Sequence, residues 1–129
     1  MNDIDLVYSI VSLNRMDFVK MVSNILKIEN KNNYIIYISL NKNNINDKMF
    51  NNTIYEKIIK FNFTDIEKKS LFDLHIENFN KVNYKYKFKY FFILSNESYL
   101  YESPKLNNFV ENEEKFIFTY KPRFFLKIA

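Results

Sequence analysis

The chain has 129 residues, a net charge of +4 and 47% hydrophobic residues, which is typical of one folded domain. It contains no glycine, no cysteine and a single histidine, His75, so glycine-rich phosphate loops, dinucleotide fingerprints, disulfides, thiol catalysis and structural zinc sites are excluded. No apolar run could span a membrane, and the acidic amino terminus is unlike a signal peptide. We therefore expect a single cytoplasmic domain over residues 1–129, without a cofactor. Backbone positions with positive φ must use Asn or Asp, so pairs such as Asn51-Asn52 are candidate turns.

The first half of the chain alternates apolar runs with one amphipathic pattern. Ile4–Leu13 is rich in β-branched and aromatic residues and predicts a central strand. Asn14 follows as the N-cap of a helix with one apolar stripe. Tyr34–Leu40 predicts a second strand and Ile58–Phe63 a third, and Asp47–Glu56 between them is ambiguous between a short helix and a loop.

A capping box predicts the start of the next helix. Thr64 and Glu67 have the spacing at which a threonine hydroxyl and a glutamate satisfy each other's backbone amides, and the helix is expected to run to about Asn80. Lys89–Leu94 then forms a short apolar run that ends at a polar turn. Such a run is typical of a strand buried on both faces.

Three further elements follow in the sequence. Ser103-Pro104 predicts the start of a short helix, and Lys115–Tyr120 and Arg123–Ile128 predict two strands that could pair as a hairpin. Strands that alternate with helices predict an α/β fold with right-handed crossovers. We expect a doubly wound, mostly parallel, Rossmann-like sheet in a three-layer α/β/α arrangement.

Polar turns follow three of the predicted strands, at Ser12–Asn14, Asn41–Asn44 and Ser95–Ser98. The carboxyl ends of parallel strands meet at one edge of a sheet, so these turns would lie together and could form a ligand crevice. The alternative for each is a solvated turn made of residues that tolerate turn geometry.

Two segments resemble family-14 glycosyltransferases, the core-2/I-branching enzymes and their bacterial relatives. Ile36–Lys42 (Ile-Tyr-Ile-Ser-Leu-Asn-Lys) resembles the second strand of that family, with Ser39 and Asn41 in place of its His and Asp. Tyr90–Leu100 is similar to a later family segment that ends Leu-Ser-Gly-Gln-Asp-Tyr-Pro. The resemblance covers only the amino-terminal, nucleotide-sugar-binding part of such an enzyme. It implies a GT-A-like fold, a nucleotide-sugar donor, a glycan acceptor and no metal.

The resemblance also implies a set of site residues. Nucleotide-sugar contacts would come from Ser12, Asn14, Ser39, Asn41, Lys42, Ser95, Asn96 and Ser98. Glu97 is the only carboxylate in its turn, and it would be the general base of a metal-independent glycosyltransferase. His75, within a predicted helix, is either a catalytic base or a hydrogen-bonded core residue. Whether the chain is an enzyme or a truncated, non-catalytic relative stays open.

Two other functions are compatible with the sequence. The first is a small protein-interaction module that binds a partner, or itself as a homo-oligomer, through its aromatic surface or edge strands. The second is nucleic-acid binding, because Asn83–Tyr90 alternates lysines with aromatic residues. That alternation is equally typical of a half-buried strand, and we favour the strand.

Overall fold

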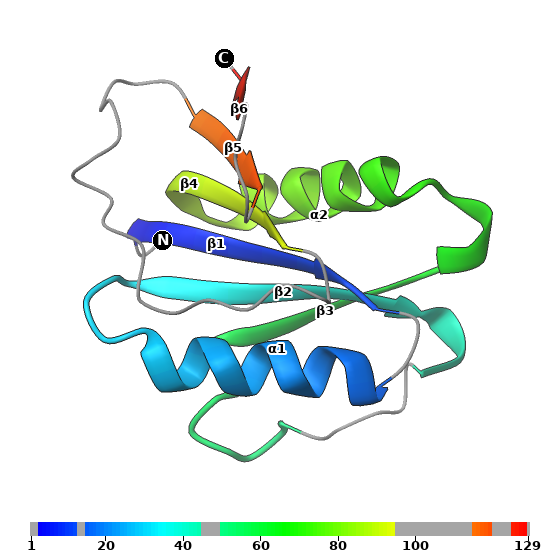
Figure 1. The fold of residues 1–129 in the computed structure, drawn as a ribbon, viewed down its shortest axis with the longest axis horizontal. Coiled ribbons are helices and arrows are strands. Elements are labelled where there is room, and N and C mark those ends of the chain that lie inside the picture. Colours follow the sequence, from blue (N-terminus) through cyan, green and yellow to red (C-terminus); the bar gives the residue numbers. More distant parts are fainter. Residues whose placement is uncertain (1–2, 13–14, 45–49, 95–114, 120–124, 129) are drawn as a thin grey trace.

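The computed structural model describes residues 3–12, 15–44, 50–94, 115–119 and 125–128 (Figure 1). Its helices and strands, in chain order, are β1 (Asp3–Val11), α1 (Arg15–Ile28), β2 (Tyr34–Asn41), the 3-10 helix η1 (Lys42–Asn44), β3 (Ile59–Thr64), the 3-10 helix η2 (Ile66–Lys68), α2 (Leu71–Lys85), β4 (Lys87–Leu94), β5 (Lys115–Thr119) and β6 (Phe125–Ile128).

The strands form one six-stranded sheet in the order β3-β2-β1-β4-β5-β6. β1 pairs in parallel with both β2 and β4, and parallel pairing continues outward to β3 and to β5. β6 pairs with β5 in antiparallel orientation, as predicted for the last two strands. The prediction of a doubly wound, mostly parallel sheet with a central first strand is therefore confirmed.

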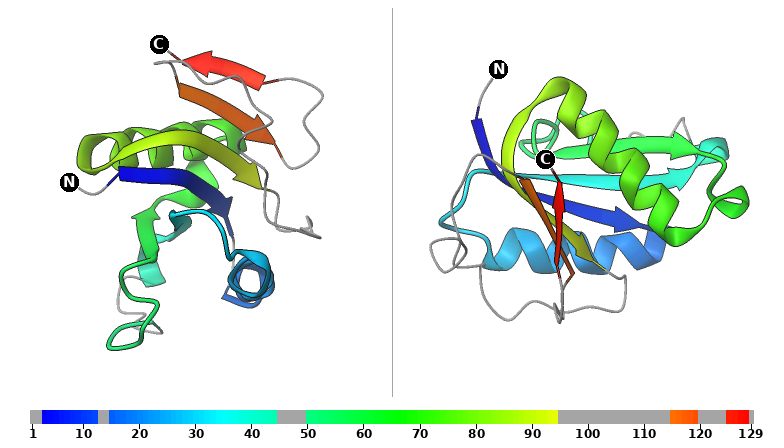
Figure 2. Two further views of the ribbon diagram at one scale, coloured as in Figure 1. Left: turned by 90° about the vertical axis from the view of Figure 1, so that its left-hand side faces the viewer. Right: turned by 90° about the horizontal axis from the view of Figure 1, so that it is seen from above.

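The two long helices cover opposite faces of the sheet (Figures 1 and 2). The α1 face holds the larger apolar cluster, in which Phe18 and Ile25 of the helix pack on Leu6, Ile38 and other strand residues. The α2 face holds a smaller cluster. Strand β4 contributes to both, since Phe91 lies in the second cluster and Phe92 in the first. This confirms that β4 is a strand buried on both faces.

An irregularity near the start of β1 changes which layer its side chains enter. The backbone amides of Asp5 and Leu6 both donate to the carbonyl oxygen of Asn33, at 2.8 and 3.2 Å. Ile4 packs in the α2 cluster while Leu6 packs in the α1 cluster, although simple alternation would place both on one face. The same change occurs on the neighbouring strand β4, where Phe88 and Tyr90, the partners of Ile4 and Leu6, also lie in opposite clusters.

The predicted capping box is wrong. Thr64 is the last residue of β3, where it pairs with Asn41, and Ile66–Lys68 forms only the 3-10 helix η2. Helix α2 begins at Leu71, with Ser70 as its N-cap accepting from the amide of Asp73 at 3.1 Å. The reason is tertiary: the Thr64 hydroxyl accepts a hydrogen bond from the Lys69 ammonium instead of capping a helix.

The other boundaries differ less. Helix α2 continues to Lys85, beyond the predicted end, so only the last part of the Lys/Tyr-rich segment is strand. Residues 50–58 form turns rather than a helix, and Asn52 has a φ of 61°, as expected for a chain without glycine. Asn14 and the helix predicted after Ser103 lie outside the described residues. Within the described part, no helix is both long and apolar enough to cross a membrane.

Candidate functional site

The strand order creates a switch point between β1 and β4. From β1 the chain moves outward through β2 to β3, then returns across the sheet to β4 and continues to β5 on the other side. The helices change face at the same time, because α1 packs on one face and α2 on the other. In open α/β sheets, ligands bind outside the carboxyl ends of the strands at such a point.

Three of the residues predicted to contact a nucleotide-sugar lie at this carboxyl edge. Ser12 directly follows β1, is 1% exposed, and its amide donates to the carbonyl oxygen of Ser39 at 3.1 Å. Asn41 ends β2 and Lys42 begins η1. The exposed Lys42 ammonium lies 3.1 Å from the carboxylate of Asp65, and its hydrogen bond keeps the Asp65 pKa below its usual value. The structure therefore brings two strand ends and one cation together at this edge.

Ser39 and His75 lie elsewhere, between the sheet and α2. They belong to a group of side chains that we call the buried polar cluster: Ser9, Ser39, Asn62, His75 and Asn78, each 2% exposed or less. The strand residues of this group come from three neighbouring parallel strands, and the other two come from α2. Ser39 thus faces away from solvent in this structure.

Asn78 is the centre of the cluster. Its Oδ1 accepts hydrogen bonds from the Ser39 hydroxyl at 2.7 Å and from Nδ2 of Asn62 at 3.1 Å. Its Nδ2 donates to the Ser9 hydroxyl oxygen at 3.0 Å. One helix residue therefore holds the three neighbouring strands β1, β2 and β3 on this face through side-chain hydrogen bonds.

The cluster continues to the surface through charged groups. Asn62 donates to Oε1 of Glu77 at 2.9 Å and accepts from the Lys81 ammonium, while Lys69 pairs with Oε2 of Glu77 at 2.6 Å. Burial alone would raise the pKa of Glu77, but the hydrogen bonds from Lys69, Asn62 and Thr64 outweigh it and lower that pKa. The carboxylate is thus held ionised where the cluster meets solvent.

His75 forms a serine–histidine pair with Ser9. The Ser9 hydroxyl oxygen lies 2.8 Å from Nδ1 of His75 and already accepts a hydrogen bond from Nδ2 of Asn78, so we assign the hydroxyl as the donor to Nδ1. Burial lowers the pKa of His75 to about 4, so the ring is neutral at pH 7. A serine beside a histidine base is the arrangement of a nucleophile. Both side chains are sealed, however, at 0% and 2% exposure, and a substrate has no access to them.

Sequence reasoning missed most of the buried polar cluster. The available signal was a polar residue inside an otherwise apolar strand: Ser9 in β1, Ser39 in β2 and Asn62 in β3. Burying such groups is costly unless they are hydrogen-bonded, so each indicates a partner on the facing element. The helix partners Asn78 and His75 carry no comparable signal, because polar residues are ordinary on a helix.

The remaining predicted site residues are not described. Asn14, Glu97 and the turn residues Ser95, Asn96 and Ser98 all lie outside the described residues. Among the residues that the structure does describe, no group of three or more acidic or histidine side chains could hold a metal ion.

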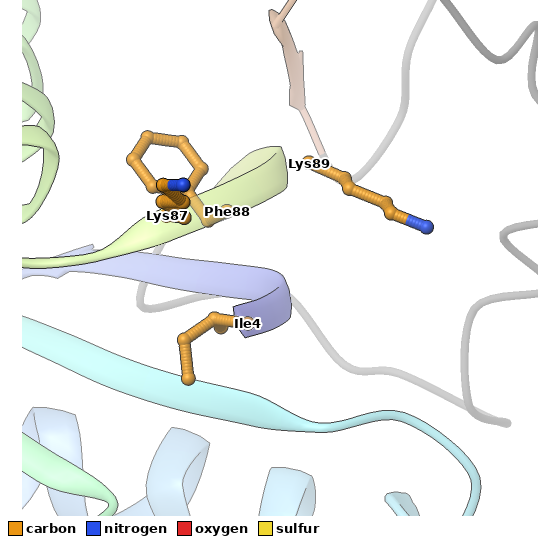
Figure 3. Close-up of a pocket in the computed structure, with 4 residues that line it drawn as sticks. All are labelled: Ile4, Lys87, Phe88 and Lys89. Carbon is orange, nitrogen blue, oxygen red and sulfur yellow. The ribbon is translucent and has the colours of Figure 1, made fainter. Parts of the chain in front are cut away.

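Two hollows lie away from the carboxyl edge. One, of about 210 Å³, is lined by Ile4, Lys87, Phe88 and Lys89 at the amino end of β4 (Figure 3). In the close-up, Lys87 and Lys89 extend in different directions, so their ammonium groups do not converge on one ligand. The other hollow, of about 420 Å³, lies against the second half of α2.

The fold defines a small α/β domain of the Rossmann-like type, with its switch point between β1 and β4. No model of a known protein family matches the chain, and neither a curated protein nor a solved structure does. The similarity to family-14 glycosyltransferases therefore stays a hypothesis based on the two segments described above.

Proposed function

We propose that the chain is a glycosyltransferase-like, nucleotide-sugar-binding domain that acts in the cytoplasm and holds its ligand at the carboxyl edge of the sheet. The observation that carries the proposal is the strand order, because it gives a switch point between β1 and β4. Ligand crevices of open α/β sheets lie at this position. Glycine-rich phosphate loops are absent, so side chains would have to supply the contacts to the diphosphate.

Lys42 is the residue best suited to a diphosphate contact. Its side chain is 64% exposed and its partner Asp65 is 36% exposed. Exposed ion pairs of this kind add little stability, so Lys42 can exchange Asp65 for a phosphate at small cost. Asn41 beside it would offer an amide to the uracil or ribose of the donor, as the resemblance implies.

Binding without sugar transfer is the simplest form of this proposal. His75 cannot act as a base on a substrate while its ring is sealed between α2 and the sheet. A general base would have to be supplied by Glu97, as the sequence predicts. The proposal therefore centres on donor binding, with a glycan acceptor and transfer activity only if Glu97 takes that role.

Isothermal titration calorimetry with UDP-sugars tests the proposal. We expect binding that weakens several-fold in Lys42→Ala, because one phosphate contact is lost, and that is unchanged in the matched variant Lys87→Ala at the opposite edge. Millimolar UDP-sugar that neither releases heat nor raises Tm would rule the proposal out. So would equal weakening by both variants.

One observation favours the alternative of a protein-interaction module. Leu71 and Phe72, adjacent in the first turn of α2, are 62% and 53% exposed. Neighbouring exposed apolar side chains are common where proteins associate. Light scattering after size exclusion checks this: association that is abolished by Leu71→Ser with Phe72→Ser would support the module, and a monomer at all concentrations would count against self-association.

A further inference from the structure

The larger hollow lies on the flank of the domain, between the second half of α2 and strand β2. It is lined by Tyr37, Asn80, Lys81, Tyr84 and Lys85. The helix residues form one patch, because Asn80 and Tyr84, like Lys81 and Lys85, are one helical turn apart. A volume of about 420 Å³ lies within the range that holds small organic ligands.

The buried wall of this hollow carries the Tyr37 hydroxyl, which has no hydrogen-bond partner among the described residues. Tyr37 is only 9% exposed, and its side chain makes no hydrogen bond with any residue in the described part of the chain. Burial, then the nearby Tyr86 and Glu77, raise the Tyr37 pKa, so the phenol keeps its proton and can donate. The Tyr37 hydroxyl can therefore donate a hydrogen bond to a ligand in the hollow.

The lining is basic and contains no carboxylate. Lys85 has no hydrogen bond or ion pair with the residues that the structure describes, and Lys81 donates only to the neutral amide of Asn62. Lys60 lies opposite Tyr37 in the register of the neighbouring strand β3, and it adds a third cation nearby. Two ammonium groups and a phenolic donor favour an anionic ligand with several oxygens, such as a phosphate.

The outer wall offers an aromatic surface. Tyr84 is 87% exposed, so its ring packs against almost nothing in the folded chain. Exposed aromatic rings beside lysines are the combination with which proteins stack bases while binding the phosphate backbone. The hollow therefore combines a stacking surface with phosphate donors.

We propose that this hollow binds a nucleoside phosphate, either free or as part of a single strand. The base stacks on Tyr84, and the phosphate accepts hydrogen bonds from Lys81, Lys85 and the Tyr37 hydroxyl. The site is distinct from the nucleotide-sugar site proposed above, because it lies on the flank of α2 and not at the carboxyl edge. A ligand could occupy either site without the other.

Titration of the ¹⁵N-labelled protein with adenosine monophosphate, monitored by NMR, is the test. We expect amide shifts concentrated in residues 80–85 and at Tyr37, with inorganic phosphate and adenosine each binding more weakly than the nucleotide. Tyr84→Ala and Lys85→Ala should each weaken binding by about fivefold or more. For Tyr84→Ala, about fivefold is the smallest effect expected when one stacked base is lost. Both side chains are exposed, so neither variant should disturb folding.

Two further variants separate the outcomes. Tyr84→Phe keeps the ring and should retain affinity, and Lys42→Ala should leave adenosine monophosphate binding unchanged, whatever it does to UDP-sugars. An oligodeoxyadenylate that binds more tightly than the mononucleotide, with steep salt dependence, would identify a strand as the ligand. Equal affinities would identify the free nucleotide.

Three results would overturn the proposal. The first is no shift with millimolar nucleotide or oligonucleotide. The second is binding that Tyr84→Ala and Lys85→Ala both leave intact. The third is a response confined to the carboxyl edge and abolished by Lys42→Ala, which would support the nucleotide-sugar site while removing this one.

Discussion

The hydroxyl of Ser9 lies 2.8 Å from Nδ1 of His75, although the two residues are 66 positions apart in the chain. Ser9 is on the central strand and His75 is in the second turn of α2, so the contact fixes that end of the helix on the middle of the sheet. Asn78, one turn further along the helix, donates to the same hydroxyl oxygen. These buried contacts make α2 sensitive to single substitutions.

Replacement of Asn78 by alanine should strongly destabilise the fold. The change removes the acceptor of Ser39 and Asn62 and the donor to Ser9, which leaves buried polar groups without partners. Each fully unpaired group costs about 1–3 kcal/mol. Because Asn62 keeps Glu77 and Ser9 keeps His75 as partners, we expect the free energy of unfolding to fall by roughly 2–4 kcal/mol. Urea denaturation monitored by circular dichroism measures this.

Asn80→Ala is the matched control, because Asn80 is an exposed asparagine in the same helix. Its effect should lie within about 0.5 kcal/mol. If both variants unfold at the same urea concentration as the parent, the buried polar cluster does not stabilise the fold.

Stability should depend on pH through His75. Its pKa is about 4 in the folded chain, where burial favours the neutral ring, and about 6.5 when unfolded. Between these values the unfolded chain binds a proton that the folded chain does not. The free energy of unfolding should therefore be highest above pH 6.5 and fall by roughly 3 kcal/mol as the pH drops to 4.

The variant His75→Gln isolates this effect, because the chain has a single histidine. Its unfolding free energy should change much less between pH 6.5 and 4, and the NMR signal of the parent imidazole should titrate near pH 4. An imidazole that titrates near pH 6.5 in the folded protein would contradict the sealed position of His75.

The hydrogen bond between Tyr8 and Glu29 should contribute to stability on the other face. The phenol donates to Oε2 of Glu29 at 2.6 Å, and the same carboxylate accepts the backbone amide of Asn32 at 3.1 Å on Oε1. Tyr8→Phe removes one charge-assisted hydrogen bond and should cost about 1.5–3 kcal/mol in urea unfolding. Tyr34→Phe, which alters a half-buried ring near Tyr8, should cost less. Equal losses of unfolding free energy in the two variants would show that the hydrogen bond from Tyr8 to Glu29 adds no particular stability.

Ser70, and not Thr64, should act as the N-cap of α2. Ser70→Ala removes the acceptor of the Asp73 amide and should cost about 1 kcal/mol. Ser23→Ala, at an exposed position inside α1, should be neutral or slightly stabilising, since alanine is the better helix former. Thermal unfolding compares the two, and an unchanged Tm for Ser70→Ala would contradict the assigned cap.

Much of the fold could be predicted because its signals are local. The apolar runs of β1, β2 and β4 and the apolar stripe of α1 are visible in the order of the residues, and their alternation indicates a parallel sheet. The start of α2 could not be predicted in the same way. Thr64 fits a capping box locally, but strand pairing and Lys69 engage it elsewhere.

The candidate site was only partly predictable. Strand ends can be located from sequence, so Ser12, Asn41 and Lys42 were expected at one edge, and they lie there. Ser39 lies on the face of β2 that α2 covers, and the pairing of that face with α2 follows from the chain topology and not from the local pattern. The hollow beside Tyr37 likewise forms only when α2 packs on β2, because its lining comes from both elements.

The sequence by itself determined the class of fold, the absence of glycine-dependent phosphate loops, and the polar character of the strand ends, since each depends on residue type and spacing along the chain. The tertiary structure decided the partners of the buried polar groups. Ser9, Ser39 and Asn62 lie far from Asn78 in the sequence, and only the crossover that lays α2 over three strands brings their donors and acceptors within hydrogen-bond distance. A hydrogen bond between distant residues depends on geometry that no local pattern encodes.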